Sequence, residues 1–146
     1  MDIELSFADT MERVGMPFIK LTVNDHEGYF LLDTGANNSH IDGEFAKEIG
    51  AKEVPGEVNV ITSMLGDSAV AHSYSVAMTF GNLCLTDVVL SEASFAPVNE
   101  SLKEYSMRMH GIIGMSFMRM LHGYIDLDSL TLTLRLSEIE QHKQPC

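Results

Sequence analysis

The sequence predicts a small, mostly β domain, a closed barrel or sandwich with one or two short helices. The chain has 146 residues, a length that suits one domain with a real hydrophobic core. Its apolar runs are short and rich in Val, Ile, Thr, Phe and Tyr, which is the length and composition of strands. Few stretches have the periodicity of a helix, and we find no internal repeat or linker.

The expected strands follow one another as hairpins, each separated by Gly, Asn, Asp or Ser. They cover residues 18–23 with 29–32, 58–62 with 73–79, then 83–90, and finally 124–127 with 130–134. The segment 64–68 is the expected tip of the second hairpin. Short helices are expected over 43–49, where Asp42 is a candidate cap, after Asn99 through Tyr105, and over 116–121.

The charge of the chain limits its partners. The chain has nine basic residues and 21 acidic ones, so its net charge is −12. An acidic surface repels phosphate backbones and anionic lipids, so we expect neither nucleic acid nor a membrane as a partner.

The termini and the cysteines indicate a cytoplasmic protein. No apolar run approaches the ~20 residues that span a bilayer, and the acidic N-terminus lacks the apolar core of a signal peptide. The two cysteines, Cys84 and Cys146, are too few for a secreted disulfide scaffold, and we expect both to be free thiols.

The tripeptide Asp33-Thr34-Gly35 is the strongest candidate for a reactive site, because it directly follows four apolar or aromatic residues. An aspartate at the end of a buried strand is unfavourable unless it is paired, hydrogen-bonded or protonated. The glycine allows a sharp turn and the close approach of a ligand. The alternative is an ordinary strand followed by a turn.

A second motif, Gly111-Ile112-Ile113-Gly114, completes a pattern. Together the two motifs resemble the retropepsin-like aspartic peptidases, the family of retroviral proteases and their cellular relatives. The resemblance covers residues 16–136, with 1–15 as an N-terminal extension and 137–146 as a polar tail. It implies the closed β-barrel or sandwich of that family, with residues 112–114 packed behind the catalytic loop.

The resemblance also implies an assembly and a chemistry. The chain has one catalytic signature, so an aspartic endopeptidase of this family would be a homodimer with Asp33 from each copy at one site. Thr34 would hydrogen-bond across the two-fold axis. Two adjacent carboxylates share one proton and activate a water against a peptide bond, without a metal or other cofactor. The implied substrate contacts are Ala36, Asn37, Asn38, Met64, Leu65, Gly66, Ile112 and Ile113.

Several positions depart from the family pattern. Asn37 and Asn38 stand where retroviral enzymes have acidic residues, and Met115-Ser116 follows Gly114 in place of Arg-Asn, so support for the loop must differ. The hairpin tip, the expected flap, has only Gly66. Ala36 cannot donate the hydrogen bond of a serine, so the pair should keep its proton to higher pH, unless Ala36 is merely small. These departures leave an alternative open: a weakly active or inactive protein-binding or dimerisation module.

Histidines and methionines carry weaker signals. The six histidines lack metal-ligand spacing, and we expect them at the surface or in turns. Five of the ten methionines lie between Met107 and Met120. They fill the core or form an adaptable apolar pocket, and core filling is favoured.

Overall fold

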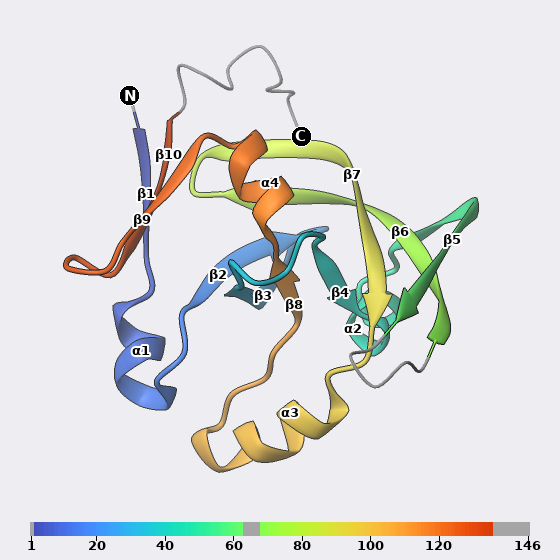
Figure 1. Ribbon diagram of the computed structural model, residues 1–146, viewed down its shortest axis with the longest axis horizontal. Coiled ribbons are helices and arrows are strands. Elements are labelled where there is room, and N and C mark those ends of the chain that lie inside the picture. Colours follow the sequence, from blue (N-terminus) through green and yellow to red (C-terminus); the bar gives the residue numbers. More distant parts are fainter. Residues whose placement is uncertain (1, 63–67, 136–146) are drawn as a thin grey trace.

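The computed structural model describes residues 2–62 and 68–135 (Figure 1), and for residues 56–62 and 68–71 the backbone alone. The elements follow in the order β1 (Asp2–Ser6), α1 (Ala8–Val14), β2 (Phe18–Val23), β3 (His26–Leu32), β4 (His40–Asp42), α2 (Gly43–Glu48), β5 (Lys52–Thr62), β6 (Ser68–Phe80), β7 (Leu83–Ala93), α3 (Ala96–Leu102), the 3-10 helix η1 (Lys103–Tyr105), β8 (Gly111–Ile113), α4 (Met115–Met120), β9 (Gly123–Asp126) and β10 (Thr131–Arg135).

Six strands close into a barrel. They pair in the order β2-β3-β8-β4-β7-β6, and β2 pairs again with β6, where Thr22 opposes Thr79 and Val23 opposes Met78. The pairs β3–β8 and β4–β7 are parallel and the others are antiparallel, while β5 adds to the free edge of β6. The predicted fold class, a small closed β-barrel with short helices, is confirmed.

Alternation along the strands separates two hydrophobic clusters. On β3, Phe30 and Leu32 point into the barrel core, whereas Tyr29 and Leu31 point to its outer face. The segment 94–110, which carries α3 and η1, covers that outer face. The buried members of this second cluster are Phe18, Phe95, Leu102, Met107 and Met109.

A three-stranded sheet joins the two ends of the described chain. Its order is β1-β10-β9, and the three strands lie together on one side of the barrel in Figure 1. Ile3 and Phe7, both within the predicted N-terminal extension, enter the main hydrophobic core. Thr10 of α1 also donates its hydroxyl to the carbonyl of Phe18, at the start of the barrel.

Two local expectations are wrong. Asn99 does not cap α3, because this helix begins after Phe95 with a proline in its first turn. The Asn99 side chain instead hydrogen-bonds both the N–H and the carbonyl of Met109. Cys84 is disulfide-bonded rather than a free thiol, while Cys146 lies outside the described residues.

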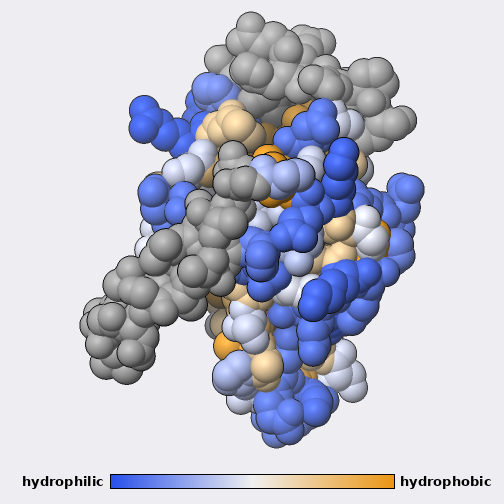
Figure 2. Space-filling model, turned by 90° about the vertical axis from the view of Figure 1, so that its right-hand side faces the viewer, coloured by the Kyte–Doolittle hydropathy of each residue, from blue (hydrophilic) through white to orange (hydrophobic). Residues whose placement is uncertain are grey.

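The surface on the side of β5, β6 and α2 is mostly hydrophilic, with only small hydrophobic areas between polar side chains (Figure 2). In the described parts of the chain, none of the helices has the length and apolar character needed to cross a membrane.

Candidate active site

Asp33 stands where β3 leaves the barrel. Its backbone N–H donates to the carbonyl of Ile113 (3.1 Å), so pairing with β8 continues one residue beyond the strand. The chain then turns: the Gly35 N–H donates to Asp33 Oδ1 (2.9 Å), and the Ala36 N–H donates to the Asp33 carbonyl (3.2 Å). The other carboxylate oxygen has no hydrogen-bond partner among the described residues. The loop therefore orients a partly exposed carboxylate through its own backbone.

Gly114 packs directly behind this loop, as the sequence predicts. A Cβ at Gly114 would lie 2.9 Å from the Ala36 carbonyl oxygen and 2.7 Å from the Asn38 carbonyl carbon, closer than real side chains come. The Gly114 N–H also donates to Ser39 Oγ (2.9 Å). Only glycine allows the end of β8 to approach the backbone of the loop this closely.

The start of α4 holds the loop from the same side. The Met115 N–H donates to the Ala36 carbonyl (2.8 Å), and the Ser116 N–H donates to the Asn37 carbonyl (3.1 Å). The Ser116 hydroxyl donates to Asn37 Oδ1 (2.9 Å). Neutral hydrogen bonds thus support the loop at the positions where the retroviral pattern has charged residues, as the departures at Asn37 and Ser116 predict.

The other predicted site residues lie in different environments. Thr34, Gly35, Asn37 and Asn38 are exposed, and Ala36 is partly buried. Of the two isoleucines, Ile112 reaches the outer face near Leu31, whereas Ile113 is fully buried in the barrel core. Met64, Leu65 and Gly66 lie outside the described residues.

Comparison with known families decides what this loop belongs to. The family model described as aspartyl protease matches residues 19–117, more than half of the chain and both motifs. The chain belongs to the aspartyl protease family. No curated protein sequence matches it.

Solved structures show that the chain has the retropepsin-like fold. A retropepsin-like aspartic protease from Rickettsia conorii is 17% identical, with a TM-score of 0.55 over 92% of this chain and 88% of the other. The retroviral protease-like domain of Ddi1 from Leishmania major is 18% identical, with a TM-score of 0.53 over 82% and 87%. EIAV protease complexed with the inhibitor HBY-793 is 18% identical, with a TM-score of 0.56 over 77% and 93%.

Ser39, Ser116 and His40 complete the surroundings of the Asp33 loop. Neither serine has a local pattern that indicates its role, because each side chain bonds a group 75 or more residues away along the chain. His40, at the start of β4, is half-buried, and burial lowers its pKa. It therefore adds no positive charge beside the loop at neutral pH.

Proposed function

We propose that this protein is an aspartic endopeptidase in which two copies of the chain each contribute Asp33 to one site. The observation that carries the proposal is the Asp33 loop itself. It orients one carboxylate through the Gly35 amide, and Gly114 supports it from behind. The chain holds a single loop of this kind, so a second carboxylate must come from a second copy.

The chemistry follows from the pair. Two carboxylates at close range do not both ionise, so they share one proton. The ionised carboxylate takes a proton from a water, whose oxygen attacks the peptide carbonyl carbon, while the protonated carboxyl hydrogen-bonds the carbonyl oxygen. The tetrahedral intermediate then collapses, the C–N bond breaks, and the amine leaves with a proton from the pair.

Other residues of the loop and its neighbourhood hold the two copies together or contact the peptide substrate. Thr34, exposed beside Asp33, bonds its counterpart across the two-fold axis. Substrate contacts come from Ala36, Asn37, Asn38 and Ile112, and from Met64, Leu65 and Gly66, which the sequence predicts at a hairpin tip. Ile113 is excluded from direct contact, because its side chain is buried in the barrel core.

The test compares Asp33→Asn with Asp25→Asn, the same substitution in an exposed turn. An amide cannot act as the base, so Asp33→Asn should lower cleavage of an unstructured peptide mixture by several orders of magnitude between pH 3 and 8. Asp25→Asn should cleave like the unchanged protein, and both variants should keep its melting temperature within a few degrees.

Sedimentation of the same samples tests the assembly. The unchanged protein should sediment as a dimer of the 16.1 kDa chain at micromolar concentration. A monomer that still cleaves peptides would refute the shared site. Cleavage at the unchanged rate by Asp33→Asn would place the chemistry elsewhere, and a folded dimer without any cleavage would favour the binding-module alternative.

A further inference from the structure

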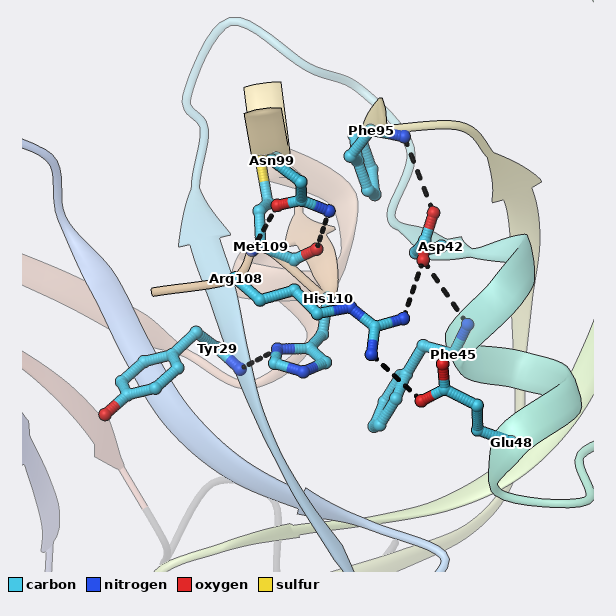
Figure 3. A network of polar contacts seen from close by, with 9 residues as sticks. All are labelled: Tyr29, Asp42, Phe45, Glu48, Phe95, Asn99, Arg108, Met109 and His110. Carbon is cyan, nitrogen blue, oxygen red and sulfur yellow. Dashed lines mark hydrogen bonds and ion pairs between the residues drawn. The ribbon is translucent and has the colours of Figure 1, made fainter. Parts of the chain in front are cut away.

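His110 lies outside the candidate active site and has a defined structural task. It ends the segment 94–110, directly before β8, and its ring lies between β3 and α2 (Figure 3). The Tyr29 N–H donates to His110 Nδ1 (2.9 Å), and the His110 N–H donates back to the Tyr29 carbonyl (2.9 Å). The ring edge also packs on Phe45, with 4.5 Å between ring centroids.

These contacts determine the protonation state of the imidazole. A backbone N–H can only donate, so Nδ1 carries no proton and the neutral ring has its proton on Nε2. A second proton on Nδ1 would oppose the Tyr29 N–H and break this bond. Burial first and the nearby charge of Arg108 second lower the pKa of His110 to about 4, although Asp42 and Glu48 act in the opposite direction.

The charged groups around His110 do not stabilise a protonated, positively charged imidazole. Asp42 and Glu48 face it from the two ends of α2, but Arg108 already binds both, at 3.2 and 2.9 Å (Figure 3). From β3, the Tyr29 ring lies 6.4 Å away between centroids. A protonated His110 would therefore no longer accept the hydrogen bond from the Tyr29 N–H, and the positive charge of Arg108 would repel it.

Along the chain, His110 is also close to Ile113 and Gly114, the residues of β8 and its end that support the Asp33 loop. Its carbonyl accepts from the Asp42 N–H (2.8 Å), and β8 starts at the next residue. Because β8 has three residues, Ile113, which accepts from Asp33, and Gly114 follow within four residues of His110.

We propose that His110 is a pH-sensitive positioning residue: its neutral ring fastens the start of β8 to β3, and protonation releases this fastening and loosens the support behind the Asp33 loop. The proposal goes beyond the proposed peptidase activity, and its test requires no cleavage.

The test measures amide hydrogen exchange of the full chain by NMR between pH 7.5 and 4, with each rate normalised to that of an unstructured chain. The Tyr29 amide should lose protection tenfold or more as the pH falls from about 6.5 to 4, as the depressed pKa requires. The amides of Gly114 and Met115 should lose protection over the same range.

Two variants and a control separate titration from packing. His110→Asn keeps an acceptor oxygen near the Nδ1 position but cannot be protonated, so the pH response of these amides should flatten. His110→Leu lacks the acceptor, so Tyr29 should be poorly protected at every pH. His122→Asn changes an exposed histidine and should keep the response of the unchanged protein.

The outcomes decide the proposal even if a variant does not fold. In the unchanged protein, the His110 ring signals and the Tyr29 amide shift must titrate together, and separate titrations would overturn the proposal. An equal pH response in folded His110→Asn would also overturn it. Loss of protection at Tyr29 alone, with Gly114 and Met115 unaffected, would overturn the link to the Asp33 loop.

Discussion

Replacing Gly114 with alanine tests whether the close contact behind the Asp33 loop holds the site together. The new Cβ would lie 2.7 Å from the Asn38 carbonyl carbon. Carbon atoms in good contact are about 3.5 Å apart, so the loop and the end of β8 must separate by about 0.8 Å. The φ of Gly114 is −90°, which alanine adopts freely, so the effect comes from steric contact and not from backbone conformation.

The magnitude follows from the bonds that this shift stretches. The bonds from Met115 N–H to the Ala36 carbonyl (2.8 Å) and from Gly114 N–H to Ser39 Oγ (2.9 Å) would both exceed bonding distance. Two such bonds contribute about 2 kcal/mol, and overpacking adds about 1–3 kcal/mol. We therefore expect a loss of about 4 kcal/mol in the free energy of unfolding, or a fall of roughly 10 °C in melting temperature.

Thermal and urea unfolding measure this loss, and Gly50→Ala is the control. Gly50 has a φ of +65° and open space around it, so alanine there adds backbone strain of about 1 kcal/mol and no steric contact. Gly114→Ala should be the less stable of the two by about 3 kcal/mol and should cleave peptides poorly. Equal melting temperatures with full cleavage in both variants would refute the reasoning, because the loop would then accommodate the new Cβ without losing stability or activity.

Two further substitutions test neighbouring parts of the argument. Ala36→Ser adds a hydroxyl that can stabilise the ionised pair, so the acid limb of the kcat/KM profile should move down by about half to one pH unit; an unshifted limb would leave Ala36 as merely a small residue. Asp42 caps α2 through the Phe45 N–H (3.3 Å) and binds Arg108. Asp42→Ala loses the cap as well as the ion pair, so urea unfolding should show it about 1 kcal/mol less stable than Asp42→Asn, which keeps an acceptor; equal stability would refute the capping role.

Local patterns predict most of the barrel because its strands carry their own signals. The strand predicted over 18–23 has the bounds of β2, and Asp42 caps α2 as expected. By contrast, nothing in the sequence indicated β1 or α1. Asp2–Ser6 becomes a strand by pairing with β10, more than 120 residues away along the chain, and such pairing is invisible in a five-residue segment.

The site divides in the same way. The places of Asp33 and Gly114 could be predicted because two short motifs carry the family resemblance, and because the close approach behind the loop allows only glycine. The expectation that every histidine lies at the surface or in a turn is wrong for His110, whose partly buried ring accepts a bond from β3. Tyr29 and His110 are 81 residues apart, and an imidazole that accepts a backbone bond has no characteristic spacing. The segment 94–110 is therefore held by contacts that only the folded chain brings together.

Acid has opposite consequences at the Asp33 pair and at His110. In the proposed mechanism, falling pH supplies the shared proton of the Asp33 pair and so favours activity. At His110 it weakens the fold: the pKa is about 4 when folded and about 6.5 when unfolded, so its contribution is complete above pH 6.5 and is lost towards pH 4. This difference corresponds to about 3 kcal/mol, and screening of the partly exposed ring reduces it to about half. Domains are stable by about 5–15 kcal/mol, so the fold survives this loss but becomes weaker. The acid limb of an activity profile therefore contains both effects, and melting temperatures measured at the same pH values separate them.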